Sequence, residues 1–427
     1  MKANTIKAGR QERSNALMRF GVWTASALLL ALLPIVFSSP LAVTIMNQMG
    51  ISIVFALSYN MLLGQGGMLS FGHAVYFGLG GFSAVHVMTF VDIDGWPIPL
   101  PFLPLLGGMF GLVFAVIVGS FSTRRAGTVF AMTSLGIGEL IAACSIIFVV
   151  FFGGEEGISG DRTMGPAVFG YNFVSELEVY SLTAIIVFLT AMLMYLFSRT
   201  PAGRMANAVR DNAERAEFLG YSQRKVRFIS FCASGFFAGI AGGLFAINYE
   251  ILTEENLNLV TSGWVLLMAY VGGIGYFIGP IIGAVLLTLL QTVLSNHTEI
   301  WRLYLGILFL LTVMYAPNGL IGLVMMHGPA YQAGRLRDLA APYAKTLPSL
   351  LAGLIGIIAL LEMIHHLNAS GTAAAIWEVF GREIALKTPL PWLIATILVI
   401  LGLIGMKQAA PGLREAWDLA NTPDRLS

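Results

Sequence analysis

A few polar side chains lie inside long apolar stretches of this 427-residue chain. Glu139 is the one charged residue that we place near the centre of such a stretch. An ionisable group at that depth costs about 2.5–3.5 kcal/mol on membrane-insertion scales, so it is expected to face the protein interior or a polar path. Two roles remain open for it: a hydrogen-bonded glutamate that ties helices together, or a contact to a passing solute.

Two glycine-rich stretches interrupt the apolar pattern. One reads GQGGMLSFGHAVYFGLGG, over 64–81, and the other reads GGIGYFIGP, over 272–280. Glycine and proline oppose a continuous helix, and irregular backbone at membrane depth survives only against protein or a water-filled cavity. Interrupted spans indicate either a transport path or tight interhelical turns, and both interpretations stay open for each break. The candidate path residues are Tyr59, Asn60, Ser70, His73, Glu139, Gly272, Gly273 and Gly275.

The sequence lacks the common catalytic and metal-binding patterns. It contains no CxxC, HExxH or GxxxxGK[ST] sequence, and its two cysteines, Cys144 and Cys232, lie in apolar segments. We therefore expect no catalytic residue, no metal site and no cofactor bound by this chain. A membrane-embedded enzyme is disfavoured, since such enzymes group several ionisable residues near the membrane surface.

The elements that carry these residues are apolar helices. Hydrophobic residues make up 57% of the chain and charged residues 11%, against about 25% charged in ordinary soluble domains. The pattern predicts an all-α, polytopic membrane protein with a ten-span core and two additional C-terminal spans. The predicted spans are 18–38, 41–63, 73–91, 103–121, 128–152, 179–198, 227–247, 260–272, 277–295, 302–324, 349–364 and 391–406.

The distribution of basic residues predicts the orientation. With the N-terminus in the cytoplasm, 20 of the 24 lysines and arginines fall in cytoplasmic segments, as the positive-inside rule requires. A cleaved signal peptide is the alternative for the first span, but that stretch exceeds a typical signal core. The predicted parts are a cytoplasmic segment (1–17), a core (18–325), a cytoplasmic loop (326–348), a transmembrane hairpin (349–406) and a cytoplasmic tail (407–427).

One polar stretch inside the core, TPAGRMANAVRDNAERAEFLG (200–220), predicts a single amphipathic helix of about 17 residues. Thr200 is expected to cap it, Pro201 to begin it and Gly220 to end it. The predicted apolar stripe is Met205, Val209, Ala213, Ala216 and Leu219, and the other face carries Arg204, Arg210, Asp211, Glu214, Arg215 and Glu217. The alanine-rich stripe without tryptophan favours docking to a partner protein over resting in the lipid interface.

Several strings resemble those of a known family. Glu214-Arg215-Ala216-x-x-x-Gly220 resembles the E-A-A-x-x-x-G loop of ABC importer permeases, departing from it at Arg215. The strings LSYNMLLGQGGMLSFGHAVYFGLGGFSA, SLGIGEL and VGGIGYFIGPIIGA resemble the branched-chain amino acid permease family, in the family's order. With the wider string around 200–220, the resemblance covers most of residues 45–325, is nearest to the LivM-like half of the LivH/LivM pair, and leaves the C-terminal spans unexplained.

The resemblance implies a subunit of a bacterial inner-membrane ABC importer. Its partners would be a second, LivH-like permease, two cytoplasmic ATPases that bind ATP and magnesium, a periplasmic binding protein and membrane lipid, with no nucleic acid. The segment 200–220 would be the coupling helix. The expected substrates are branched-chain amino acids, with urea, short amides or other small solutes as the alternative. An ion-coupled secondary transporter using Glu139 is a weaker alternative, since it leaves the 200–220 helix without a role.

Overall fold

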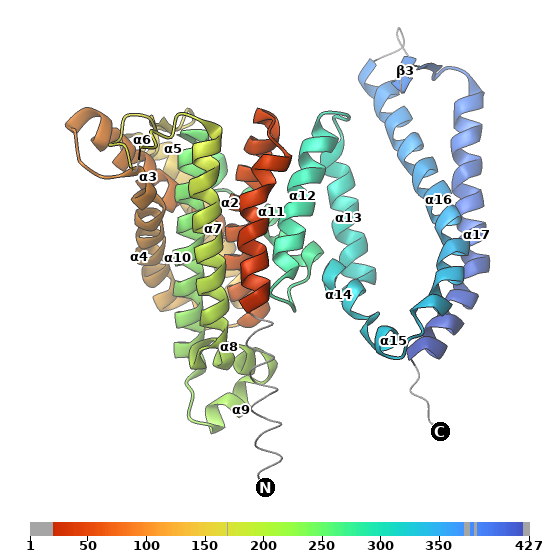
Figure 1. Ribbon diagram of the computed structural model, residues 1–427, viewed down its shortest axis with the longest axis horizontal. Coiled ribbons are helices and arrows are strands. Elements are labelled where there is room, and N and C mark those ends of the chain that lie inside the picture. The colour runs from red at the N-terminus through yellow and green to blue at the C-terminus, as the bar shows by residue number, and fades with distance from the viewer. Residues whose placement is uncertain (1–19, 169, 371–375, 380–381, 422–427) are drawn as a thin grey trace. The chain divides into compact units, whose positions relative to one another are not determined.

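The computed structural model describes residues 20–168, 170–370, 376–379 and 382–421, and it is built almost entirely of helices (Figure 1). Each of the twelve predicted spans contains a helix. Through the first half of the chain these are Phe20–Val36, α2 (Pro40–Asn60) with one π-helical turn η1 (Met61–Gln65), α3 (Ala74–Asp94), α4 (Leu103–Ser122), α5 (Thr128–Ile147) and α7 (Glu176–Arg199). They continue as α10 (Gln223–Tyr249), α11 (Leu259–Gly272), α12 (Gly279–Ser295), α13 (Trp301–Tyr315), α16 (Leu336–Ser370) and α17 (Pro389–Asn421).

The helices differ in their capacity to cross a membrane. In the described part of the chain, eight are long and apolar enough, or nine if α13 and the segment from α14 (Gly319–Met325) through α15 (Gly328–Gln332) form one bent span. The bend between them is 46°. Helix α11 has only 14 residues, about 21 Å, because the second glycine-rich break ends it at Gly272. The predicted span 128–152 is also interrupted, because the chain leaves α5 at Phe148 before the short α6 (Val149–Phe152).

The chain divides into two compact units, and each is described by itself. The first unit contains residues up to 292 together with 309–321, and the second contains 293–308 and the residues from 322 onward. In the first unit, α10 packs against α2, α3 and α4, and α3 and α10 are the most buried helices. Two 3-10 turns, η2 (Leu100–Phe102) and η3 (Glu254–Asn256), complete its connections.

Glycines bring the backbones of α3, α4 and α10 into direct contact. A Cβ on Gly239 would overlap the backbone of Gly107, and a Cβ on Gly80 would overlap the backbone of Gly239. One turn later, a Cβ on Gly242 would overlap the carbonyl of Phe77. Small residues permit this close approach between membrane helices, where dispersion rather than water drives association. The three helices therefore form a tightly packed block.

The end of this unit opposite α8 (Pro201–Asp211) is closed by two acidic loops that pair with each other. Strand β1 (Ile158–Ser159) runs antiparallel to β2 (Ile251–Leu252), pairing Ile158 with Leu252. Beside them, the guanidinium of Arg162 is 8% exposed and donates to Glu176 Oε1 at 2.8 Å and to the carbonyl of Phe173 at 3.0 Å. This arginine joins the loop to the start of α7 and to the end of α10, where it also donates to the Ile247 carbonyl.

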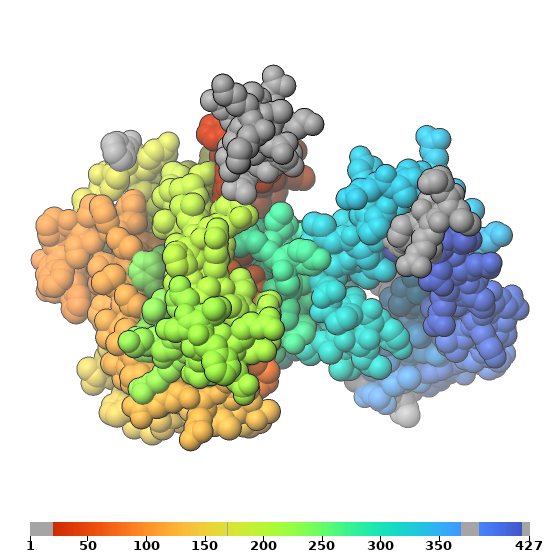
Figure 2. Space-filling view, turned by 90° about the horizontal axis from the view of Figure 1, so that it is seen from below, coloured from red at the N-terminus to blue at the C-terminus, as the bar shows by residue number. Residues whose placement is uncertain are grey.

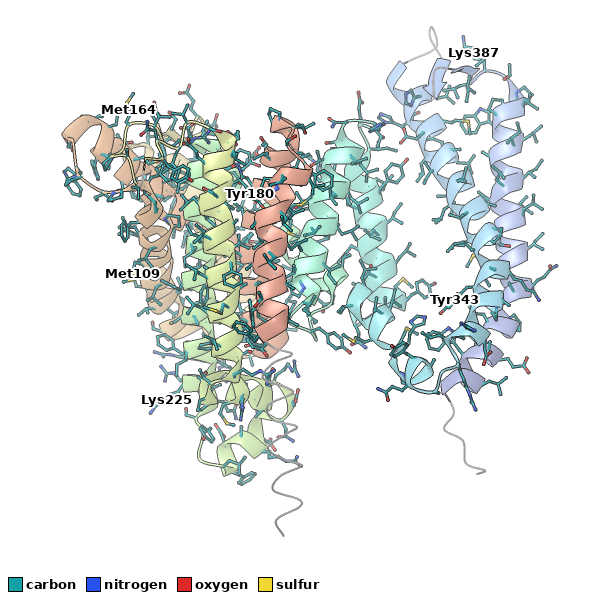
Figure 3. The ribbon with its side chains drawn as sticks, in the orientation of Figure 1. Met109, Met164, Tyr180, Lys225, Tyr343 and Lys387 are labelled. Atoms are coloured by element: carbon teal, nitrogen blue, oxygen red, sulfur yellow. The ribbon has the colours of Figure 1, made fainter. Side chains whose placement is uncertain are left out.

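The second unit is dominated by the hairpin of α16 and α17, closed by strands β3 (Ile376–Val379) and β4 (Arg382–Ala385). Gly353 and Gly402 lie in direct backbone contact where the two helices cross. Tyr343, labelled in Figure 3, accepts a hydrogen bond from Trp417 Nε1 at 3.0 Å. Helix α16 begins at Leu336, inside the predicted cytoplasmic loop 326–348. The predicted tail is likewise helical through Asn421.

Candidate functional site

The first glycine-rich break lies in the interior of the first unit. Residues 66–73 leave helical structure after η1 and run back beside α2 before α3 begins. The hydroxyl of Tyr59 donates to the Ser70 carbonyl at 2.9 Å, and His73 Nε2 lies 3.0 Å from Ser58 Oγ. Tyr59 and His73 are both fully buried. Four predicted path residues therefore lie close together in the structure: Tyr59, Asn60, Ser70 and His73.

Side chains of neighbouring helices accept hydrogen bonds from backbone amides of this break that have no helical partner. The Phe71 amide donates to Ser134 Oγ of α5 at 3.0 Å, and the Ala74 amide donates to Ser262 Oγ of α11 at 3.0 Å. Neither serine was predictable from the local sequence, because both contacts join positions more than 60 residues apart. Irregular backbone at this depth persists because these serines replace the missing helical partners.

Several buried polar atoms of the break are nevertheless without a partner. Among the described residues, none hydrogen-bonds Asn60 Oδ1, Ser70 Oγ or His73 Nδ1. A buried polar group left unsatisfied costs about 1–3 kcal/mol, so such groups are rare in a purely structural turn. Because several such atoms lie at one break, we infer that they bind a solute or gain hydrogen-bond partners in another conformation of the chain.

The second break, Gly272 to Pro280, meets the first. A Cβ on Gly64 would overlap the carbonyl of Ile274, so the two breaks touch through their backbones. Gly273 has φ +116°, a conformation that L side chains rarely adopt, and it also abuts Gly319 at the start of α14. Gly272 is buried against Gly279, whereas Gly275 is exposed and has nothing within 4 Å of an added Cβ. The end of η1, the end of α11 and the start of α14 therefore lie together.

Glu139 lies apart from this cluster. It is on α5, and its side chain is exposed on the outer surface of the chain rather than directed inward. Among the described residues, no hydrogen bond or ion pair involves its carboxylate. A glutamate that ties helices of this chain together, one of the two roles left open by the sequence, is therefore not what the described residues form.

The polar stretch 200–220 forms two helices, so the prediction of a single helix is wrong. Helix α8 (Pro201–Asp211) begins as predicted, with Thr200 Oγ1 accepting from the Gly203 amide. The chain then turns at Asn212, whose side chain accepts from the Arg215 amide and caps α9 (Ala213–Phe218). Gly220, at φ +86°, ends α9 as predicted, with the Tyr221 amide donating to the Ala216 carbonyl at 3.1 Å.

The break at Asn212 changes which side chains are buried. Ala206, Val209, Ala216 and Val226 form a small apolar cluster with Met205 and Ala213 beside it, so most of the predicted stripe packs on its own chain. Leu219 is 68% exposed, contrary to the prediction, and Phe218 is 90% exposed. Figure 2 shows α8 and α9 facing the viewer at this end of the unit, and Figure 3 labels Lys225 nearby.

The outer face of these helices is charged. The predicted residues Arg204, Glu214 and Arg215 are exposed there, and Ala216 is 1% exposed. The projecting segment thus combines two apolar side chains at its tip with charged groups around them. Phe218 was missed in the sequence because a helix continuing from α8 would have placed it beside the charged face.

Arg210 connects this segment to the first break. Its Nη1 donates to the Gly64 carbonyl, and its side chain packs so closely on Gly67 that a Cβ there would lie 2.7 Å from Arg210 Cγ. The same guanidinium pairs with Asp211 at 2.9 Å. Through Gly64, the α8 helix is one contact away from the second break at Ile274.

Many apolar helices, two interrupted spans that meet, and a projecting polar helix pair define an all-α, multi-pass membrane permease. The profile of the family described as "Branched-chain amino acid transport system / permease component" matches residues 41–314, well over half of the chain. The chain belongs to this family.

Individual relatives agree with the family. The chain is 27% identical over 294 residues to the LivM permease protein of the high-affinity branched-chain amino acid transport system of Escherichia coli K12, covering 64% of this chain and 68% of that protein. It is 27% identical to the Salmonella typhimurium LivM protein, covering 69% and 74%. It is 25% identical to the E. coli K12 LivH permease protein, covering 63% and 90%. No solved structure matches.

Proposed function

We propose that this permease is a translocation subunit of an ATP-driven importer that moves branched-chain amino acids, or related small solutes, from the periplasm to the cytoplasm. The observation that carries the proposal is the α8–α9 pair, a capped and packed projection whose tip exposes Phe218 and Leu219. Neither a proton-coupled transporter nor a channel has an evident use for such a projection. The named LivM and LivH relatives support the substrate class.

The positive-inside distribution supports placing α8 and α9 in the cytoplasm of a bacterial inner membrane, with the N-terminus on the same side. There the exposed tip would seat in a groove of a cytoplasmic ATPase, one of two that bind ATP and magnesium. This chain would then need no nucleotide site of its own. A second, LivH-like permease would complete the membrane part, since the relatives are of both the LivM and the LivH kind.

The Arg210 contact suggests how motion of the ATPases would reach the path. Movement of α8 would pull on the Gly64 carbonyl and, through Gly64, on the second break at Ile274. Both breaks lie at the α8 end of their spans, where they would form the cytoplasmic gate. As the gate opens, the unpaired polar atoms of Asn60, Ser70 and His73 would form hydrogen bonds with solute or water.

The opposite end supports a binding protein as a further partner. The paired loops place Glu155, Glu156 and Glu255 in exposed positions around β1 and β2. A periplasmic binding protein with basic residues on its rim would complement this acidic surface. A zwitterion with an apolar side chain is passed best by helix ends and backbone groups, which fits the scarcity of fixed charge inside the first unit.

The test is reconstitution with purified partners in proteoliposomes. We expect leucine uptake that requires ATP, the ATPases and the binding protein, and that is lost with Phe218→Asp because the ATPases no longer bind. The matched control is Ile93→Asp, a similarly exposed apolar residue (74%) at the opposite end of the unit, which should leave ATPase binding intact. Uptake driven by a proton gradient without ATP would refute the proposal, and uptake of urea or a short amide in place of leucine would revise the substrate.

A further inference from the structure

Helix α5 presents one complete face away from its own chain. The exposed positions are spaced by three and four residues, so they form a single stripe along the helix. They are Thr128, Val129, Met132, Gly136, Glu139, Leu140, Ala143, Ile146 and Ile147. Glu139 stands about 17 Å along the helix from its first residue, near the middle of its length.

The opposite face of α5 holds the helix in this rotation. Ser134 Oγ accepts from the Phe71 amide, and a Cβ on Gly138 would lie 3.1 Å from the Gly72 Cα. The Phe130 ring is fully buried and meets the Phe231 ring edge to face, with centroids 5.9 Å apart. Turning Glu139 inward would break all of these contacts, so the carboxylate belongs on the outside of this chain.

The exposed face of α5 differs from that of the neighbouring helix α4 because it carries a carboxylate and two small residues among its large apolar side chains. Apart from Ser120 near its end, the outward residues of α4 are large and apolar, as a surface against lipid tails requires, and Figure 3 shows Met109 among them pointing away from the helices. The others are Leu105, Phe110, Val113, Val116 and Ile117. On α5, by contrast, a carboxylate stands between Gly136, which has nothing within 4 Å of an added Cβ, and Ala143.

We infer that this face of α5 is the contact surface for the second permease subunit, with the Glu139 carboxylate paired to a hydrogen-bond donor of that subunit. Lipid tails offer no donor to a carboxylate, whereas a facing helix supplies one and approaches closely at the small residues. The inference rests on the proposed function in one respect, the presence of a second permease. The facing span is expected to carry a serine, threonine, asparagine or basic residue opposite Glu139.

Photo-crosslinking in the assembled complex tests the surface directly. A photoreactive phenylalanine analogue is placed at Met132 or Leu140 on α5, and at Val113 or Ile117 on α4 as matched controls. We expect adducts with the tagged second permease from both α5 positions and lipid adducts alone from both α4 positions. Adducts from α4 only, or from neither helix in a complex that transports with ATP, would overturn the inference and leave the proposed function intact.

Substitution of Glu139 tests the hydrogen bond. Glu139→Leu should lower the amount of second permease that co-purifies by about fivefold or more, whereas Glu139→Gln, which still bonds, should retain it. Normal assembly of Glu139→Leu with a loss of transport alone would mean that the carboxylate lines the solute path, which overturns the inference. Failure of the wild-type chain to assemble with any permease would instead count against the proposed function.

Discussion

The Arg210 contact gives a prediction with a magnitude. A hydrogen bond from a charged donor is worth about 1.5–3 kcal/mol, and the Arg210 side chain is 38% exposed, so we take the lower end, about 1.5 kcal/mol. At 1.36 kcal/mol per factor of ten, removing it with Arg210→Ala should lower the solute moved per ATP hydrolysed by about tenfold. ATPase binding should persist, because the tip residues Phe218 and Leu219 are unchanged.

The assay measures ATP hydrolysis and leucine uptake in the same proteoliposomes. The matched control is Asp211→Ala, which removes the ion pair at 2.9 Å but leaves the donation to the Gly64 carbonyl. Its uptake per ATP should stay within about fivefold of the wild type, since an exposed ion pair is worth at most about 1 kcal/mol. Equal ratios for Arg210→Ala and the wild type would refute the reasoning, as would an equal loss in both variants.

Three further predictions concern stability. Arg162→Ala should weaken the paired loops by about 3 kcal/mol, the lower end for a broken buried pair because Glu176 is 35% exposed, and raise amide exchange over 158–162 by about 100-fold, unlike the exposed control Arg302→Ala. Gly239→Ala should destabilise the first unit by about 1–3 kcal/mol in detergent unfolding, unlike Gly263→Ala, where nothing lies within 4 Å. Hydrogen bonds from Thr163 hold the pKa of Asp161 below its usual value, so their stabilising effect should be lost as pH falls through that lowered pKa, and Asp161→Asn should remove this pH dependence of loop exchange.

Much of the architecture follows from composition and spacing. Runs of about 20 apolar residues predicted a helix at every span, including α11 and α12 on either side of the second break. The caps of α8 and α9 were predictable because Thr200-Pro201 and Gly220 have backbone preferences that do not depend on distant residues. Asn212 was a missed local signal, since asparagine favours caps over helix interiors.

The relation between the two breaks was not predictable from one sequence. Gly64 and Ile274 are separated by about 210 residues, and nothing in either glycine-rich string specifies the other as its neighbour. The same holds for Arg210, whose charge predicted an exposed face while its aliphatic carbons pack on Gly67. The direction of Glu139 depended on the rotation of α5, which the distant serine and glycine contacts set.

The glycine contacts among α3, α4 and α10 have a mechanical consequence. Where the backbones touch, no side chain lies between them that could change its rotamer and absorb a small displacement. We therefore expect these three helices to move together as one rigid body. Compliance is then concentrated where hydrogen bonding is irregular, at η1 and at Gly273. A displacement of α8 would therefore change the conformation at η1 and Gly273 rather than bend α3, α4 or α10.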